Sequence, residues 1–245
     1  MATKLSVNLN KVATLRNTRS VGIPSVTHCA RLCLSAGADG ITIHPRPDER
    51  HIRPRDVRDL AHVVAEYPGV ELNIEGNPVH GLLEYVESYR PSQCTLVPDD
   101  EGQATSDHGW DLVKDGARLE PILKRLRKLG VRSSLFMDAD ASSMPRAKEI
   151  GADRVELYTE PYAAAFARGD AGTALAACRD AAQASRDAGL GVNAGHDLNL
   201  ENLGRFLDQV PNVVEVSIGH ALIAEALEHG LADTVTRYLA IARRA

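Results

Sequence analysis

Eight short apolar runs recur along the chain, and most of them end on a polar or ionisable residue. The runs cover residues 5–10, 40–45, 70–76, 93–99, 132–140, 154–160, 191–196 and 213–220. They are rich in Val, Ile and Leu, as buried parallel strands are. Helical patterns fill the intervals between them. This alternation predicts a single (β/α)8 TIM barrel, with residues 1–245 forming one domain.

Proline, asparagine and glycine mark several of the expected helices. Pro54 stands near the start of segment 54–67, and Asn77-Pro78 is expected to open segment 77–90 as N-cap and first helical residue. Segment 111–130 is long and amphipathic. The polar, glycine-containing segment 99–109 follows the fourth run, which favours a lid or a binding loop over an unimportant insertion.

Composition limits which side chains can fill the core. The chain is 44% hydrophobic but only 4% aromatic, so Val, Leu, Ile and Ala must fill the core. We expect these side chains to form the branched aliphatic layers found inside parallel barrels. The four cysteines, Cys29, Cys33, Cys94 and Cys178, contain no C-x-x-C pair, which favours buried free thiols in a reducing cytoplasm.

The charge distribution excludes one class of partner. A net charge of −5 provides no general basic field for nucleic acid. Several arginines nevertheless lie near the ends of the first two runs, which points to small anions as ligands, although Arg50, Arg53 and Arg55 suit a solvated surface at least as well. These arginines are Arg16, Arg19, Arg46, Arg50 and Arg53. We find no signal-peptide pattern and no apolar stretch near 20 residues, so we expect a cytoplasmic protein without a membrane partner.

Ionisable residues at the strand ends suggest acid–base chemistry. His44 and Glu75 end neighbouring strands, and His196 ends a strand across the barrel. We expect His44 and Glu75 to alternate with inward-facing apolar partners, which points both side chains into the mouth. An imidazole with a near-neutral pKa and a carboxylate whose pKa a dry pocket raises form a usable acid–base pair.

A Gly-His pair ends each of the last two strands, at Gly195-His196 and Gly219-His220. Glycine lets the backbone approach an anion closely, and the N-terminus of a following helix favours phosphate. In TIM barrels the loops after strands 7 and 8 often hold a phosphate. The repeat therefore predicts a phosphate site there.

Other chemistries leave weaker signals. A divalent metal held by His44, His51, Glu75 and His196 is an alternative, although no fixed-spacing ligand motif is present. Asp138 and Asp140 could form a second carboxylate pair, but capping of the next helix is favoured. Nucleotide-binding glycine motifs are absent from the sequence. Lys11 is the only candidate near the mouth for a Schiff-base lysine.

The strand-end segments resemble the pyridoxine 5′-phosphate synthase family. The resemblance rests on residues 7–19, 37–52, 72–77, 96–98, 134–140, 192–196 and 217–222, in order along nearly the whole chain. It implies a barrel with extra helices that assembles as a homo-octamer built from dimers. It also implies condensation of 1-deoxy-D-xylulose 5-phosphate with 3-amino-2-oxopropyl phosphate to pyridoxine 5′-phosphate, inorganic phosphate and water, without metal or other cofactor.

Residue roles follow from the same resemblance. His44 and Glu75 would be general bases, and His196 a general acid. The amino-ketone phosphate would be held by Asn8 and Arg19, and the pentulose phosphate by Arg46, His51 and Thr105. Gly219 and His220 would bind a phosphate through backbone amides.

The chain departs from the family pattern at two places. Many members carry Asp-His where this chain has Asn10-Lys11, a pair that contacts the pentulose phosphate in the family. Many members also carry Gly where this chain has Asp197. Two other functions therefore stay open: a sugar-phosphate lyase or isomerase that uses Lys11, and a non-catalytic binding protein for such phosphates. The trio of His44, Glu75 and His196 argues against the latter.

Overall fold

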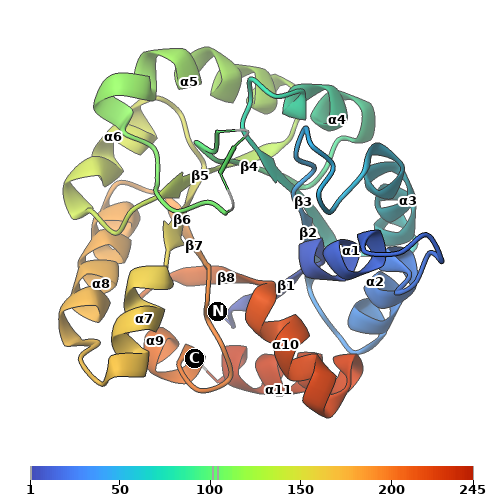
Figure 1. Ribbon diagram of the computed structural model, residues 1–245. Coiled ribbons are helices and arrows are strands. Elements are labelled where there is room, and N and C mark those ends of the chain that lie inside the picture. The colour runs from blue at the N-terminus through green and yellow to red at the C-terminus, as the bar shows by residue number, and fades with distance from the viewer. Residues whose placement is uncertain (1, 101, 104, 245) are drawn as a thin grey trace.

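The computed structural model describes residues 2–100, 102–103 and 105–244. Eight parallel strands close into one barrel in sequence order, with β8 paired to β1. Helices form a ring around the strands (Figure 1). The predicted TIM barrel is confirmed.

Each of the eight apolar runs coincides with one strand, and β1 begins one residue before its run. The strands are β1 (Lys4–Asn8), β2 (Gly40–Ile43), β3 (Glu71–Gly76), β4 (Gln93–Leu96), β5 (Arg132–Met137), β6 (Arg154–Tyr158), β7 (Gly191–Gly195) and β8 (Val213–Ile218). The helices of the described residues are α1 (Asn10–Asn17), α2 (Val26–Ser35), α3 (Pro54–Ala65), α4 (Leu82–Tyr89), α5 (Leu112–Lys128), η1 (Ala141–Ser143, one 3-10 turn), α6 (Met144–Glu149), α7 (Glu160–Arg168), α8 (Gly172–Asp187), α9 (Leu203–Gln209), α10 (His220–His229) and α11 (Leu231–Ala242).

Local signals located two of the expected helices well and one poorly. Helix α3 begins at Pro54, and α5 begins after Asp111, whose side chain accepts hydrogen bonds from the first turn. The predicted start of α4 at Asn77 was wrong, because the helix begins at Leu82. Asn77 instead bridges two loops: its Oδ1 accepts from Val79 N at 3.1 Å, and its Nδ2 donates to the Asp99 carbonyl at 3.0 Å.

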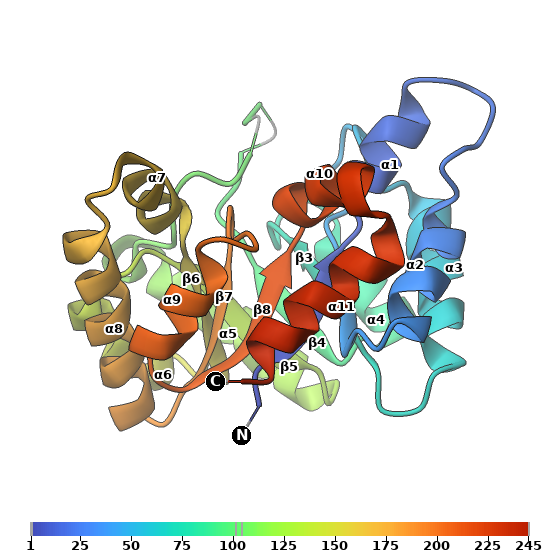
Figure 2. The same cartoon turned by 90° about the horizontal axis from the view of Figure 1, so that it is seen from below.

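Second helices follow β1, β6 and β8, where a minimal barrel has one. Figure 2 shows α1, α7 and α10 at the same end of the barrel as the loop after β4. The two ends of the chain lie at the opposite end (Figure 2). The additional helices α1, α7 and α10 therefore surround the mouth at which the strands end.

The interior of the barrel is polar, so the expectation of aliphatic layers there was wrong. Side chains on strands that are not neighbours bond to each other across the lumen. Lys4 Nζ on β1 donates to Glu71 Oε1 on β3 at 2.5 Å, and Gln93 Nε2 on β4 donates to Glu215 Oε1 on β8 at 3.2 Å. Arg154 on β6 reaches Gln93 at 3.4 Å.

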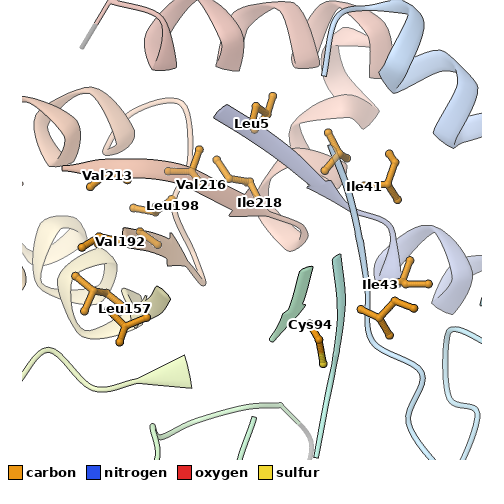
Figure 3. Packing of buried hydrophobic residues seen from close by; sticks show 14 of the residues in the cluster. Leu5, Ile41, Ile43, Cys94, Leu157, Val192, Leu198, Val213, Val216 and Ile218 are labelled. Atoms are coloured by element: carbon orange, nitrogen blue, oxygen red, sulfur yellow. The ribbon is translucent and has the colours of Figure 1, made fainter. Parts of the chain in front are cut away.

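The aliphatic side chains of the strands point outward instead and pack under the helices. Figure 3 shows Leu5, Ile41, Ile43, Val216 and Ile218 in this cluster. Residues on successive positions of a strand face opposite sides, so the strands give an apolar face to the helices and a mostly polar face to the lumen. Phe136 of β5 and Tyr158 of β6 are aromatic exceptions at the mouth. The hydrophobic core is thus a shell between the strands and the helices.

Two smaller expectations concern the thiols and the membrane. Cys33, Cys94 and Cys178 are buried free thiols, as predicted, whereas Cys29 is a free thiol that is only half-buried. Among the described residues, no helix combines the length and apolar character that a membrane crossing requires.

Candidate active site

A cavity of about 460 Å³ opens where the strands end at the mouth of the barrel. All of the predicted site residues except Arg19 line it. They are Asn8, Asn10, Lys11, His44, Arg46, His51, Glu75, Thr105, His196, Asp197, Gly219 and His220. Arg19 is exposed beyond the end of α1 and is not part of this lining. The strand-end pattern therefore predicts a shared location for residues that are far apart in sequence.

Glu75 and His44 are both buried at the mouth, with 7% and 6% of their surface exposed. Asn8 Nδ2 donates to Glu75 Oε2 at 3.5 Å, and Asn73 Nδ2 donates to Glu75 Oε1 at 3.4 Å. The backbone N–H of His44 donates to Asn10 Oδ1 at 2.9 Å, so the start of α1 fixes the end of β2.

Both side chains face the mouth, but the reason differs from the expected one. The residues that share their inward face are the polar Thr42 and Asn73, which bond to each other at 3.4 Å. The apolar neighbours Ile43 and Ile74 belong to the outer hydrophobic shell. The alternation of residues along the strands therefore points His44 and Glu75 into the mouth, as expected. The inward-facing neighbours, however, are polar and the outward-facing ones apolar, the reverse of the expectation.

The environment shifts the pKa values of His44 and Glu75 in opposite directions. Burial, reinforced by the charge of Arg46, lowers the pKa of His44 well below its ordinary value. Burial, reinforced by Glu156, raises the pKa of Glu75 well above its ordinary value. The site therefore holds a neutral imidazole beside a carboxyl group that has a high proton affinity.

Glu156 also lines the cavity, although the sequence analysis assigned it no role. Burial, followed by the charge of Glu215, raises the pKa of Glu156 to about 8. Among the described residues, its buried Oε2 has no hydrogen-bond partner. A Cβ on Gly195 would lie 2.5 Å from Glu156 Oε1, so glycine on the neighbouring strand leaves room for this carboxyl group. A glutamate between Val155 and Leu157 in a buried strand was the available signal.

His196 lies at the end of β7 in an unusual conformation. Its φ is 80° and that of Asp197 is 59°, a left-handed region that favours glycine. The His196 ring packs against Phe136 and Tyr158, with centroid distances of 5.0 and 5.3 Å. Burial lowers the pKa of His196 to about 4, while the charge of Asp197 acts in the opposite direction.

Arg46 connects the second strand end to the loop after β4. Its guanidinium forms a buried ion pair with Asp99 and donates to the Gln103 carbonyl at 2.9 Å. Ser106 Oγ donates to the same Asp99 carboxylate at 2.7 Å. Burial, followed by the charge of Arg46, lowers the pKa of the nearby His51 to about 4. The described part of the 99–109 loop thus contributes Thr105 and Ser106 to the cavity wall.

The arginine cluster divides into two groups. Arg46 and Arg50 line the cavity, in agreement with an anion site. Arg16 does not, because its guanidinium is buried against Asp56 at 2.5 and 2.8 Å. Arg53 precedes α3, and its backbone N–H donates to the same Asp56 carboxylate at 2.8 Å.

The far wall of the cavity is the N-terminus of α10. Gly219 precedes this helix, and a Cβ there would lie 3.1 Å from Cβ of Asn8. Glycine therefore permits close packing of β8 against β1 at the mouth. The first N–H groups of a helix have no partner within the helix, which suits an anion.

The alternative chemistries find less support. In the described residues, no group of three His, Cys, Asp or Glu side chains is arranged to hold a metal ion. Asp140 accepts from Ser142 N at 3.0 Å as the cap of η1, and Asp138 accepts from Gly109 N at 3.0 Å. The capping interpretation is thus confirmed for Asp140, while Asp138 anchors the loop after β4.

Fold and cavity together define a TIM-barrel protein with an ionisable pocket at the strand ends. Residues 5–244 match the family model described as pyridoxal phosphate biosynthesis protein PdxJ. The chain belongs to this family.

Relatives of known annotation cover almost the whole chain. It is 59% identical over 244 residues to the pyridoxine 5′-phosphate synthase of Albidiferax ferrireducens, covering 98% of this chain and 97% of the relative. It is 54% identical over 250 residues to the enzyme of the same name from Xanthomonas axonopodis pv. citri, covering 99% and 98%.

Solved structures of distant proteins share the fold. Thiamine phosphate pyrophosphorylase from Pyrococcus furiosus superposes with a TM-score of 0.64 at 12% identity, covering 99% of this chain and 96% of that one. A tryptophan synthase structure from M. tuberculosis gives a TM-score of 0.68 at 12% identity, with coverage of 99% and 93%. At this identity the likeness concerns the barrel alone.

Proposed function

We propose that this protein is a pyridoxine 5′-phosphate synthase. It condenses 1-deoxy-D-xylulose 5-phosphate with 3-amino-2-oxopropyl phosphate and releases pyridoxine 5′-phosphate, inorganic phosphate and water. The observation that carries the proposal is the single cavity that gathers His44, Glu75 and His196 beside the α10 N-terminus. The full-length similarity to relatives of that name supports it.

The two walls of the cavity suit two phosphorylated substrates. Arg46, His51 and Thr105 line one side and are proposed to hold the pentulose phosphate, with Asn10 and Lys11 beside them. Gly219 and His220 offer helix N–H groups on the other side. Asn8 lies between that helix and Glu75, where it can hold the amino-ketone phosphate. For Arg19, the same role requires that residues 18–24 move toward the mouth.

The reaction needs several proton transfers, and the site supplies groups for them. The amine must add to the ketone, water and phosphate must leave, and the ring must close. His44 is proposed as one general base, since its lowered pKa leaves the imidazole neutral with a free lone pair. Glu75 is proposed as the second, because its raised pKa makes the carboxylate a stronger base.

His196 is proposed as the general acid that protonates departing oxygen. In the free protein its pKa of about 4 leaves the ring unprotonated at neutral pH. Bound phosphate dianions favour the charged imidazolium and therefore raise this pKa. Asp197, which also lines the cavity, acts in the same direction.

Assembly, domain organisation and location belong to the same proposal. A homo-octamer built from dimers is supported by exposed apolar side chains around the end of α1: Leu15 is 51% exposed, Val21 59% and Ile23 68%. One domain over residues 1–245 is supported by α11, which returns to pack on β1 and α2. A cytoplasmic location suits the four free thiols.

The decisive experiment mixes the purified protein with both phosphorylated substrates. Pyridoxine 5′-phosphate, followed by absorbance and mass, should form only when both substrates are present. A complete mixture that yields no product would overturn the proposal. Borohydride reduction in the presence of a keto-sugar phosphate should leave Lys11 unmodified, whereas an adduct there would favour a lyase.

A further inference from the structure

The backbone at His196 is strained and must be held in place. His196 and Asp197 are consecutive non-glycine residues with positive φ. Residues of this kind persist only where the surrounding structure imposes the conformation. The contacts that impose it therefore decide where the imidazole of His196 lies.

Side chains hold three consecutive carbonyl groups of this turn. Thr159 Oγ1 lies 2.6 Å from the Gly195 carbonyl and 2.5 Å from the His196 carbonyl, and its one proton is shared between them. Asn202 Nδ2 donates to the Asp197 carbonyl at 3.1 Å. Thr159 is fully buried and Asn202 is 1% exposed, so both donor side chains are shielded from water.

Thr159 occupies the position best suited to control His196. Its backbone N–H donates to the Gly195 carbonyl at 2.9 Å, which continues the β6–β7 ladder one residue beyond the last strand pair. The adjacent Tyr158 provides one of the rings that contact the His196 imidazole. The hydroxyl therefore ties the strained backbone to the same strand end that packs the ring.

We propose that Thr159 is a positioning residue for His196. It holds the left-handed turn so that the imidazole stays packed against Phe136 and Tyr158 and faces the cavity. This inference rests on the proposed role of His196 as general acid. Thr159 itself does not line the cavity and is not expected to contact substrate.

A hydroxyl-specific set of variants tests the proposal. T159V removes the hydroxyl with little change in shape, and T159S keeps the hydroxyl. We expect T159V to lower kcat between about tenfold and a hundredfold, since small misplacement of a catalytic group has effects of this size. KM for both substrates should change by less than about threefold, and T159S should restore kcat to within about threefold of the parent enzyme.

Thr234 offers a matched control. It is equally buried, and its hydroxyl donates to the Gly230 carbonyl at 2.9 Å in α11, away from the cavity. T234V should leave kcat unchanged while it lowers the melting temperature. If T159V behaves like T234V, with a lower melting temperature and normal kcat, Thr159 has only a structural role and the proposal is overturned.

A double-mutant cycle links the effect to His196. In the H196A background T159V should reduce kcat by less than about twofold, because the group that Thr159 positions is gone. An equal loss in both backgrounds would contradict the proposal. If T159V does not fold, T159A removes the same hydroxyl with less crowding and takes its place in the cycle.

A crystal structure of T159V provides a readout that is independent of activity. The His196 ring should leave its place against Phe136 and Tyr158, and a ring that stays there would overturn the positioning role. Normal turnover of H196A would instead remove His196 from the mechanism. In that case the crystal structure alone decides whether Thr159 places the ring.

Discussion

Arg16 and Asp56 form a bidentate ion pair that is buried between α1 and the start of α3, with side-chain exposures of 6% and 7%. The same guanidinium donates to the His51 carbonyl at 3.1 Å. Asn17 Nδ2, next in the chain, also donates to that carbonyl at 2.8 Å. The end of α1 therefore supports the loop that carries Arg46 and His51 into the cavity.

Removal of the Asp56 charge should be costly. D56N leaves a buried guanidinium without its counter-charge, and we expect a loss of about 3–5 kcal/mol in the free energy of unfolding. Urea denaturation measures it. The exposed pair of Arg58 and Asp59, with side-chain exposures of 57% and 42%, serves as the control. D59N should cost less than about 1 kcal/mol. Equal effects of the two substitutions would contradict the structural role of Arg16.

Glu75 should be needed for turnover and not for folding. E75Q keeps the size of the side chain and an acceptor for Asn8 and Asn73, but it cannot take up a proton at neutral pH. We expect kcat for pyridoxine 5′-phosphate formation to fall by about a hundredfold or more, the scale of one lost acid–base group. Glu160, another carboxylate of the cavity wall, gives the control. Near-normal turnover of E75Q, or an equal loss in E160Q, would remove Glu75 from the proton transfers.

Glu156 should make the stability of the protein depend on pH. Its pKa is about 8 in the fold and 4.5 ordinarily, so between these values the folded protein binds more protons than the unfolded chain. Stability from this group is therefore present below pH 4.5 and is lost as the pH rises toward 8.

The comparison of E156Q with the parent protein reports on Glu156 together with Glu75, because histidine titrations are common to both and the Glu156 charge acts on Glu75. The amide cannot ionise, so E156Q should gain stability relative to the parent by up to a few kcal/mol between pH 5 and pH 8. Urea denaturation at both pH values measures the difference. A difference that is the same at pH 5 and pH 8 would mean that Glu156 is not held protonated by the fold.

The charge of Asp197 should raise the pKa of His196. D197N keeps a residue type that tolerates the φ of 59° and removes the charge that raises the pKa of His196. A general acid is active while protonated, so the basic limb of the kcat profile should move to lower pH in D197N. The melting temperature should change little. A basic limb that stays in place would show that Asp197 does not act on the proton donor.

The shared location of the strand-end residues could be predicted from the sequence, because parallel strands bring their C-terminal residues to one edge of the sheet. That is why His44, Glu75 and His196 were found together. The contents of the lumen could not be predicted, because both faces of a barrel strand are buried and burial alone does not distinguish them. The family resemblance supplied residue roles that spacing does not contain.

The presence of an arginine near a strand end was not sufficient to predict whether it lines the cavity. Arg16 and Arg46 each follow one of the first two strands in the sequence, yet one is part of a buried support and the other lines the cavity. Their different environments are set by Asp56 and Asp99, acidic partners that lie 40 and 53 residues away in the chain. No local pattern connects residues at such separations.

The polar lumen limits how this barrel can change over time. Gln93 Oε1 alone accepts from Arg132 at 2.9 Å, from Asn193 at 3.3 Å and from Arg154 at 3.4 Å. A single exchange of Gln93 for an aliphatic residue would remove an acceptor that three donors of the lumen share, which would destabilise the fold. Drift at these positions is therefore expected to be concerted: descendants of this barrel should replace the inner ring as a group or keep it whole.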